Sequence, residues 1–479
     1  MRRVLPIVLA GALAGCTLEP TYLRPAPAVP ATWPIGAAYP PADQAALPSV
    51  SYRDIFRDPH LQTIIAAALA NNQDLQAAMA NVGIARAQYR VQRAQLLPKI
   101  DAAASAAESQ TRSQNQAGAS GTGVASKQVE RSFDANVGLS AFELDLFGRL
   151  RSLSHAAQQQ YLASEAGARA ARLTIIAEVA SAYLTLATDR SLLAVASETE
   201  TSAARTVELT RARLTGGIAP RTDLRQAETV LNQARSDRAD LTTLVAQDRN
   251  ALELLIGAPA ADTDLPTSIE SVDGMLAELP AGLDSKILLR RPDVAQAEYQ
   301  LRAANAQIGA ARAAFFPGIS LTALAGVASP ALSALFDSGH FVWSTQASAA
   351  QTLFDGGANR GNLALAKARR DLSVAQYQKA IQTAFSEVAD ALARRGTIND
   401  QMAAQTALEA AANDSYALAQ ARYKEGVDPF LNALDAQRTL YGARRALATT
   451  RLIRADNLVT LYRSLGGDML VEPASPPAR

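Results

Sequence analysis

A turn between two long helical patterns occurs twice in this sequence, and it constrains the fold more than any other feature. The first copy contains Gly217 and Pro220, and the second contains Gly426 and Pro429, at an offset of 209 residues. The glycine suits the left-handed position after a helix, the proline suits the first position of the next helix, and Asp428 can act as an N-cap. Each copy therefore predicts a sharp helical hairpin. The offset indicates two duplicated halves, because solenoid repeats are much shorter.

The helical patterns that lead into the two turns have nearly equal lengths. One runs from about residue 149 to 216, and the other runs from about residue 357 to 425. Helices of this length reach about 100 Å at 1.5 Å per residue. Before each long helix, the sequence predicts a shorter one, at 59–97 in the first half and at 292–316 in the second.

The first long pattern carries two adjacent apolar seams with the alternating spacing of four and three residues that is typical of coiled coils. One seam contains Ile176 and Tyr183, and the other contains Ile175 and Val179. Two seams predict neighbours on both sides of the helix, as in a ring of helices. The alternative is a long two-stranded coiled coil, which would need only one seam.

Each half also contains two segments in which apolar and polar residues alternate. In the first half they lie at 100–106 and 133–141, on either side of a polar stretch at about 107–131. In the second half a strand begins near Ile319, and a loop at about 329–341 separates it from another. Small alternating residues with a long polar connection are typical of transmembrane β-hairpins, whereas a soluble sheet would show larger inward side chains.

The N-terminus has the pattern of a secretion signal. Arg2 and Arg3 precede an apolar segment of about 11 residues, which is shorter than the ~20 residues that a membrane-spanning helix needs. The segment ends at Cys16, the only cysteine, so no intrachain disulfide can form. Leu13-Ala14-Gly15-Cys16 resembles a bacterial lipobox, whose cysteine becomes the lipidated first residue; the alternative is an ordinary signal peptide. Thr17, in place of the aspartate that favours inner-membrane retention, indicates the outer membrane.

These patterns divide the chain into six parts. Eight prolines between residues 17 and 50 exclude a helix there, so this stretch is expected to be extended. The predicted parts are a lipoprotein signal peptide at 1–15, a lipidated, proline-rich extended tail at 16–58, a first structural repeat at 59–257, a linker at 258–285, a second structural repeat at 286–467 and a C-terminal tail at 468–479.

Composition excludes several classes of function. The 46 basic and 45 acidic residues give a formal net charge of +1, which offers no argument for nucleic-acid binding. The three histidines are far apart in sequence, and no Ser–His–acid set, phosphate-binding loop or metal-ligand spacing is present. We therefore expect no catalytic residues, no metal and no cofactor, and we predict that the protein is not an enzyme.

Several motifs together match a known family. The segment from Leu279 to Glu298, which contains Arg290-Arg291-Pro292-Asp293, resembles the most specific segment of the TolC-like outer-membrane factors. Phe316-Pro317, Leu353-Phe354-Asp355-Gly356-Gly357 and both turns follow in the family's order. The chain resembles the lipoprotein branch of this family, which serves tripartite efflux pumps of the resistance–nodulation–division type. The resemblance covers nearly all of the mature chain.

The resemblance implies a mainly α fold with a membrane β-barrel. Family members are homotrimers in which each protomer gives four strands to one 12-stranded barrel, and the helices form a hollow α-barrel across the periplasm. This agrees with the strand pattern, because four strands cannot close a barrel and lipid does not tolerate unpaired strand edges. The implied function is a passive exit duct for drugs or other small toxic compounds. The implied partners are a periplasmic membrane-fusion adaptor, an inner-membrane transporter and outer-membrane lipid.

The resemblance also implies a gate at the periplasmic end. Arg422 and Tyr423 match residues that hold the closed mouth, Asp435 matches an acid that rings the closed pore, and Asp223 matches another gate-bonding acid. Surface ion pairs contribute about 0–1 kcal/mol each to stability, so the three copies of such pairs in a trimer could hold the mouth closed and still break reversibly. The alternative is that these are ordinary charges on solvated helix faces. Asp428 stands where some relatives carry a basic residue, so the bonding pattern is expected to differ here.

The two turns are further expected to contact the helical hairpins of the adaptor. The expected contact residues are Gly217, Ile218, Ala219, Pro220, Gly426, Val427, Asp428 and Pro429. Two other functions remain open at this point. One is an outlet for type I protein secretion, against which the lipobox and the Arg290–Asp293 segment argue. The other is a periplasmic coiled-coil scaffold lipoprotein, which would have no barrel.

Overall fold

A computed structural model gives the structure of residues 17–39, 51–113, 126–272, 274, 276 and 285–467. The predicted signal peptide, the predicted lipidation site Cys16 and the predicted C-terminal tail lie outside the described residues. The connection between the first two strands, at 114–125, also lies outside them.

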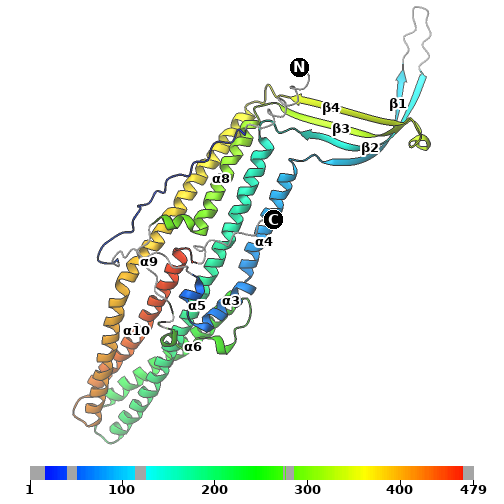
Figure 1. Ribbon diagram of the computed structural model, residues 1–479. Coiled ribbons are helices and arrows are strands. Elements are labelled where there is room, and N and C mark those ends of the chain that lie inside the picture. The colour runs from blue at the N-terminus through cyan, green and yellow to red at the C-terminus, as the bar shows by residue number, and fades with distance from the viewer. Residues whose placement is uncertain are drawn as a thin grey trace, which may run out of the picture. The chain divides into compact units, whose positions relative to one another are not determined.

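Helices dominate the described residues, and four strands interrupt them (Figure 1). The helices are α2 (Tyr52–Ile55), α3 (Pro59–Asn71), α4 (Gln73–Ala94), α5 (Arg149–Thr215), α6 (Arg221–Ile256), α7 (Ile269–Val272), α8 (Pro292–Ala313), α9 (Ala358–Lys424) and α10 (Phe430–Ser464), with short 3-10 helices η1 (Asp262–Asp264), η2 (Ser285–Arg290) and η3 (Leu332–Ala334). The strands are β1 (Ile100–Ser113), β2 (Ser126–Glu143), β3 (Gly318–Ser329) and β4 (Phe341–Ala350).

The chain divides into two compact units, each of which is assembled from both halves of the sequence. The strand unit contains Met1–Pro25, Gly83–Leu162 and Tyr299–Ala375. The hairpin unit contains Ala26–Val82, Ala163–Glu298 and Gln376–Arg479. The strand unit thus holds the sheet and the helix ends that lead into it, and the hairpin unit holds both helical turns.

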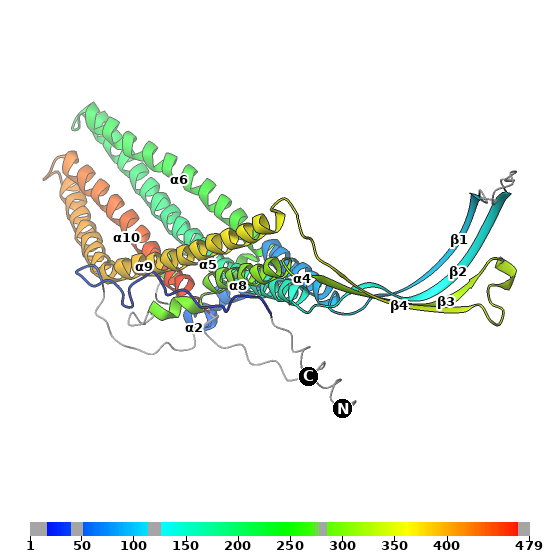
Figure 2. The ribbon, with the colours of Figure 1, turned by 90° about the horizontal axis from the view of Figure 1, so that it is seen from above.

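The four strands form one antiparallel sheet in the order β1-β2-β3-β4. They lie side by side and bend together, as Figure 2 shows. A register shift between Leu139 and Phe142 interrupts the pairing of β2 with β3, and Ala141 next to it has a positive φ of 54°. Both edge strands, β1 and β4, lack a second partner among the described residues.

The strands of the first half are longer than the alternation predicted. We expected a loop over about 107–131, but β1 continues to Ser113 and β2 begins at Ser126. The polar residues in these extensions pair across the ladder, and Glu108 faces Arg131 with an ion pair of 3.4 Å. Backbone pairing and a cross-strand charge pair therefore extend the strands through a sequence that has no apolar face.

The long helices α5 and α9 both contain 67 residues, and the turns after them begin at equivalent positions. Residues of both predicted seams of α5 are buried: Ile176, Val179 and Tyr183 have almost no exposed surface. In α9, Tyr377 and Ile381 are likewise fully buried. One stretch of α5 is long and apolar enough to cross a membrane, but 56% of it is buried within the protein. Packing between helices accounts for its composition.

The predicted helix at 59–97 is broken at Asn72, and this is a correction to the sequence-based expectation. The Asn72 side chain accepts a hydrogen bond from the Leu75 amide at 2.9 Å and donates one to the Leu255 carbonyl at 2.9 Å. It thereby caps the start of α4 and ties it to the end of α6. Similarly, α8 ends at Ala313, earlier than the predicted Phe316.

Residues 17–25 lie against helices of the strand unit. The Leu18 carbonyl accepts a hydrogen bond from Arg312 at 3.1 Å, and the Glu19 carboxylate lies 3.0 Å from Nδ1 of His155. Gly309 faces the same segment, and a Cβ there would lie 2.8 Å from Cα of Glu19. A glycine inside a helix costs about 1 kcal/mol relative to alanine, so its presence in α8 is explained by the room that the tail needs.

Residues 26–39 make separate contacts within the hairpin unit. The Gln378 side chain donates to the Ala26 carbonyl at 2.8 Å and accepts from the Ala28 amide at 3.0 Å. Trp33 stacks on Phe385 with ring centroids 4.9 Å apart. In each unit the proline-rich segment is therefore held by defined side chains.

Candidate functional site at the two helical turns

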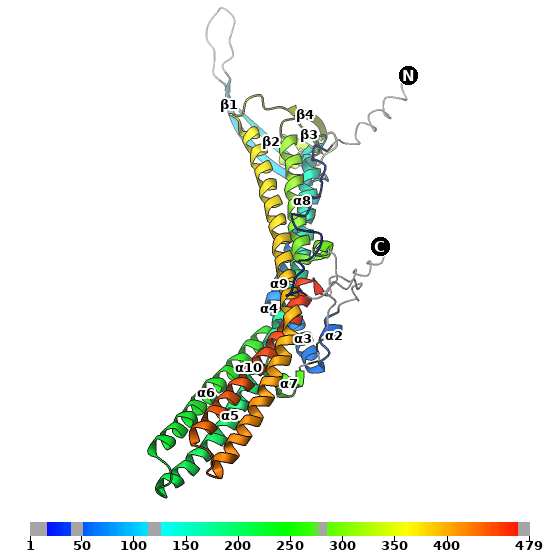
Figure 3. The same cartoon turned by 90° about the vertical axis from the view of Figure 1, so that its left-hand side faces the viewer.

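The two helical turns lie at the same end of the hairpin unit, as Figure 3 shows. Each turn closes with the same pair of backbone hydrogen bonds. In the first, the Gly217 amide donates to the Leu214 carbonyl and the Ile218 amide to the Arg213 carbonyl, both at 3.0 Å. The second repeats the pattern around Gly426, and φ is 75° at Gly217 and 76° at Gly426. These are Schellman turns, in which glycine avoids the strain of a left-handed backbone.

The starts of the next helices differ slightly from the sequence-based prediction. Pro220 and Pro429 occupy the N-cap positions, with ψ of 154° and 155°, and not the first helical positions. Asp428 therefore precedes the N-cap instead of forming it. Its carboxylate is engaged by an arginine, which removes it from capping.

Arg422 is bound within its own turn. Its guanidinium donates two hydrogen bonds to Asp428, at 2.6 and 3.1 Å. The hydrogen bonds from Arg422 lower the pKa of the Asp428 carboxyl, and the same bonds raise the pKa of Arg422. Arg422 and Asp428 thus close the second turn by an ion pair within one hairpin.

Tyr423 lies in an apolar cluster that both hairpins share. Its side chain is only 6% exposed, and its ring centroid lies 5.3 Å from that of Phe430. Its hydroxyl has no hydrogen-bond partner among the described residues. The other buried members of the cluster are Ala203, Val207, Leu224, Ala227, Leu231, Ala433 and Leu434. Within one chain, the Tyr423 side chain therefore packs the two hairpins together, and its hydroxyl makes no hydrogen bond to a described residue.

Arg213 is a residue of the site that the sequence-based interpretation did not assign. Its guanidinium donates to the Tyr423 carbonyl at 3.0 Å and to the Lys424 carbonyl at 2.8 Å. It also lies over the Tyr423 ring, 4.5 Å from the ring centroid. This is a direct connection between the turn of the first hairpin and that of the second.

The two predicted acids of the gate are not brought together with Arg422 in a single chain. Asp435 is exposed on α10, and Asp223 is partly exposed in the first turn of α6. Neither carboxylate has a hydrogen-bond or ion-pair partner among the described residues. Among all residues that the structure describes, no group of three or more His, Cys, Asp or Glu side chains could hold a metal ion.

Polar contacts continue between the hairpins behind the turns. The Ser202 and Tyr416 hydroxyls are 2.9 Å apart, and the Tyr441 hydroxyl donates to Asp237 at 2.6 Å. Burial and the hydrogen bond to Asp237 raise the pKa of Tyr441 to about 12. A further contact joins Arg444 of α10 to Glu198 of α5 at 3.1 Å.

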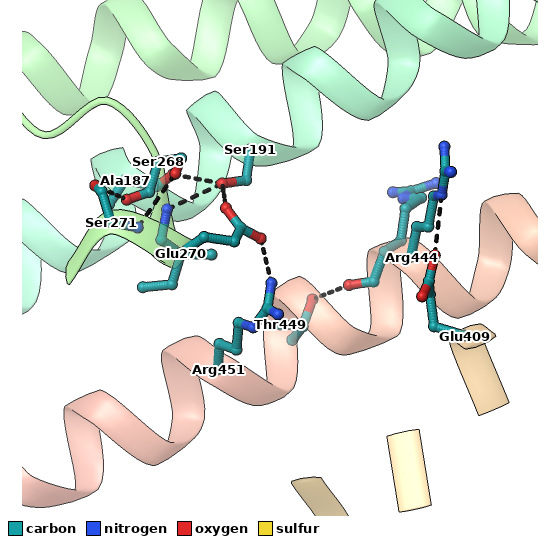
Figure 4. A network of polar contacts seen from close by, with 11 residues as sticks. Ala187, Ser191, Ser268, Glu270, Ser271, Glu409, Arg444, Thr449 and Arg451 are labelled. Atoms are coloured by element: carbon teal, nitrogen blue, oxygen red, sulfur yellow. Dashed lines mark hydrogen bonds and ion pairs between the residues drawn. The ribbon is translucent and has the colours of Figure 1, made fainter. Parts of the chain in front are cut away.

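At the far end of this series, the linker helix α7 connects the two hairpins (Figure 4). The Glu270 carboxylate accepts from the Ser191 hydroxyl of α5 at 2.8 Å and pairs with Arg451 of α10. Burial opposes ionisation of Glu270, but these hydrogen bonds and the charge of Arg451 outweigh it and lower its pKa. Linker residues thus hold α5 and α10 together.

The segment Arg290-Arg291-Pro292-Asp293 has a structural explanation. Arg291 is buried, and it donates to both Asp293 carboxylate oxygens, to Glu387 at 2.8 Å and to the Ser464 carbonyl at 2.6 Å. Arg290 beside it is exposed, and Pro292 begins α8. Through these hydrogen bonds, Arg291 therefore connects the start of α8 and the end of α10 to α9.

The chain matches the family model described as outer membrane efflux protein over residues 64–258 and 283–467. The chain belongs to this family. Outer membrane efflux proteins are channel proteins of the outer membrane and not enzymes, and they work in tripartite pumps with an adaptor and an inner-membrane transporter.

Two relatives illustrate the similarity across nearly the whole sequence. The toluene efflux pump outer membrane protein TtgC of Pseudomonas putida is 43% identical over 463 residues, which cover 96% of this chain and 94% of the relative. The outer membrane protein OprJ of Pseudomonas aeruginosa is 40% identical over 461 residues, which cover 96% of this chain and 95% of the relative.

The fold agrees with that of a solved outer-membrane channel. The crystal structure of the open state of the MtrE outer membrane channel of Neisseria gonorrhoeae has a TM-score of 0.82 and 36% identity, covering 95% of this chain and 99% of that one. This likeness confirms the predicted fold class, a mainly helical protein with α-barrel and β-barrel parts and two repeats.

Proposed function

We propose that this protein is the outer-membrane exit duct of a tripartite efflux pump and that it exports small toxic compounds passively. The observation that carries the proposal is a four-stranded sheet whose two edges are unpaired within the described residues, in a chain that matches efflux channels over 96% of its length. A duct of this kind needs no catalytic group. The outlet of a type I secretion system and the scaffold without a barrel are less favoured, because the relatives are named as efflux proteins.

The strand edges support assembly of several copies, and we propose a homotrimer. A membrane sheet must close, because each unpaired backbone group in hydrocarbon costs several kcal/mol. One chain gives four strands, and its edge strands β1 and β4 have no further partner among the described residues. Three copies joined edge to edge would give the 12-stranded barrel that the family resemblance implies.

Exposed apolar side chains on the strand unit support packing between copies. Ile84 and Val91 are exposed seven residues apart on α4, and Leu365 and Leu372 are exposed seven residues apart on α9. This heptad spacing is typical of seams between neighbouring helices. In a trimer, α4 of one protomer could cover α9 of the next.

The relatives suggest the class of exported compound. Their names refer to toluene, to solvents and to antibiotics. We propose that this protein exports apolar or amphiphilic compounds of similar size. The adaptor would meet the exposed ends of the two turns, where Ile218 is 77% exposed and Val427 is 61% exposed.

We further propose that the turns form the gate of the duct. In a trimer, three copies of the exposed Asp435 would form an acidic ring, while Asp223 and the Arg422–Asp428 pair would line the mouth. The exposure of Asp435 and Asp223 supports this assignment, since unpartnered carboxylates remain available to neighbouring protomers or to cations.

The lipid anchor is a separate part of the proposal, and it rests on the lipobox that ends at Cys16. Cys16→Ser should give protein that incorporates no labelled palmitate, because the only thiol of the chain is lost. Normal palmitate labelling of this variant would show that the anchor lies elsewhere.

The function is tested by deleting the gene and measuring the accumulation of a fluorescent amphiphilic dye in intact cells. We expect accumulation to rise and to return to normal when the full chain is restored. Purified protein should run as a heat-modifiable trimer and conduct ions in planar bilayers. Unchanged accumulation together with the absence of conductance would refute the proposal.

The orientation is tested with cysteines in the connection between β3 and β4, at residues 331–339. They should react with an impermeant maleimide on intact cells, because this connection is proposed to face the outside. Labelling only after the outer membrane is broken would contradict this topology.

A further inference from the structure

The two turns occupy equivalent positions in the duplicated halves, but they differ at one residue. This residue determines which partner the arginine of each turn can bind. At the offset of 209 residues, Arg213 corresponds to Arg422, and Ala219 corresponds to Asp428. The second turn therefore has an acid for its arginine, whereas the first has a methyl group. The duplicated sequence thus predicts different partners for two arginines in the same local backbone.

The structure shows the result of this difference. Arg422 makes two hydrogen bonds to Asp428 and stays within its own turn. Arg213 has no acid in its turn, and it reaches to the other hairpin, where it donates to the carbonyls of Tyr423 and Lys424 at 3.0 and 2.8 Å.

The receiving groups are well suited to an arginine. The Tyr423 and Lys424 carbonyls are at the end of α9, where helix carbonyls lack partners within the helix and the helix dipole is negative. The Tyr423 carbonyl also accepts from the Gly426 amide at 3.0 Å, and its second lone pair is available to Arg213. The planar guanidinium can donate to both carbonyls while its face stacks on the Tyr423 ring at 4.5 Å. A lysine could not make all three contacts.

We propose that Arg213 is a positioning residue that latches the first hairpin turn to the second and so opposes the opening of the duct. This rests on the proposed function, in which the turns form the gate. The latch holds Tyr423 in the apolar cluster that both hairpins share. The contacts of Arg213 can break without leaving its charge buried and unpaired, because Arg213 is only partly buried and water can take the place of the two carbonyls as hydrogen-bond acceptor.

The decisive variant is Ala219→Asp, which gives the first turn the acid that the second already has. The Arg422–Asp428 geometry indicates that Arg213 would then pair within its own turn and release the second hairpin. No arginine and no core residue is removed. Ala219→Asn is the matched control, because it adds nearly the same shape without the charge.

Two measurements are made on the full-length protein, with Arg213→Gln as a second variant. Conductance in planar bilayers reports opening. Intramolecular cross-linking of Ile218→Cys to Val427→Cys by a bismaleimide, read by peptide mass spectrometry, reports the separation of the turns. Arg211→Gln is the control for loss of an arginine, since Arg211 pairs with Glu228 of its own hairpin at 3.5 Å.

We expect Ala219→Asp to raise conductance at least two-fold and to lower cross-linking several-fold relative to Ala219→Asn. We expect Arg213→Gln to do the same relative to Arg211→Gln. If Ala219→Asp behaves as Ala219→Asn does in both measurements, the latch is overturned. If Arg213→Gln fails to fold, the comparison of Ala219→Asp with Ala219→Asn still tests the proposal. If the parent protein forms no channel, the proposed function fails, and cross-linking alone then tests the latch.

Discussion

Replacing Arg291 with glutamine should destabilise the hairpin unit, whereas the same change at the adjacent Arg290 should not. The two arginines differ in burial: Arg291 is 6% exposed, and Arg290 is exposed. Burial opposes the charge of Arg291, but its hydrogen bonds to Asp293 and Glu387 outweigh this and raise its pKa. The guanidinium is therefore charged at every physiological pH, and its removal leaves all of its partners behind.

The magnitude follows from the exposure of those partners. The Ser464 carbonyl belongs to a fully buried residue, and a buried acceptor without a partner costs about 1–3 kcal/mol. The side chains of Asp293 and Glu387 are 44% and 34% exposed, so water can solvate them, and each lost ion pair costs about 0–1 kcal/mol. Glutamine preserves much of the volume. We expect a loss of about 3 kcal/mol in the free energy of unfolding.

Chemical denaturation of the purified protein in detergent, followed by the circular dichroism of the helices, measures this loss. Hydrogen–deuterium exchange near Ser464 should also accelerate in Arg291→Gln. A loss that is equal in Arg290→Gln, or a loss below about 0.5 kcal/mol in Arg291→Gln, would refute the view that this segment acts through the bonds of one buried arginine.

Three other predictions concern charged groups. Asp435→Ala should reduce cation selectivity and divalent block in planar bilayers, because three exposed carboxylates would be lost from the mouth; unchanged selectivity would place the constriction elsewhere. The hydrogen bond with Glu19 raises the pKa of His155 above 6.5, so this contact stabilises tail docking fully below pH 6.5 and progressively less as pH rises through the raised pKa. Hydrogen exchange of residues 17–22, corrected for intrinsic rates, should thus be faster at pH 8 than at pH 6, and an equal difference in Glu19→Gln would contradict this. Burial and the hydrogen bond with Asp189 raise the pKa of Asp248 to about 6, so the native state is penalised above that pH and Asp248→Asn should add about 1 kcal/mol of stability at pH 7.5. An equal gain at pH 2.5, where the carboxyl is protonated in both folded and unfolded chains, would show another cause.

The helical part of the fold could be predicted from the sequence because its signals are local. Glycine and proline fix the two turns through backbone geometry, and the seam residues Ile176 and Tyr183 identify the buried side of α5 through their spacing. The helix break was not predicted, because Asn72 acts through the Leu255 carbonyl, which is 183 residues away in the sequence.

The ends of the strands and the contacts within the site were harder to predict, because they too depend on residues that are far apart in the sequence. The pairing of Glu108 with Arg131 depends on the register between two strands, which alternation alone does not fix. In the site, the sequence singled out Tyr423 as a candidate gate residue but did not indicate its burial, because the cluster around it contains residues of both hairpins. Arg213 could have been found by comparing the repeats, since Ala219 stands where the other copy has an acid.

The equal lengths of α5 and α9 limit how this chain can change in evolution. Both helices begin and end at positions 209 residues apart, and both contain 67 residues. Removing one heptad from α5 alone would keep its seams in register but would move its turn by about 10 Å. The Arg213 contact with α9 could not survive such a step. Insertions and deletions are therefore expected to occur as matched pairs, one in each half, so that the two helices share a single inherited length.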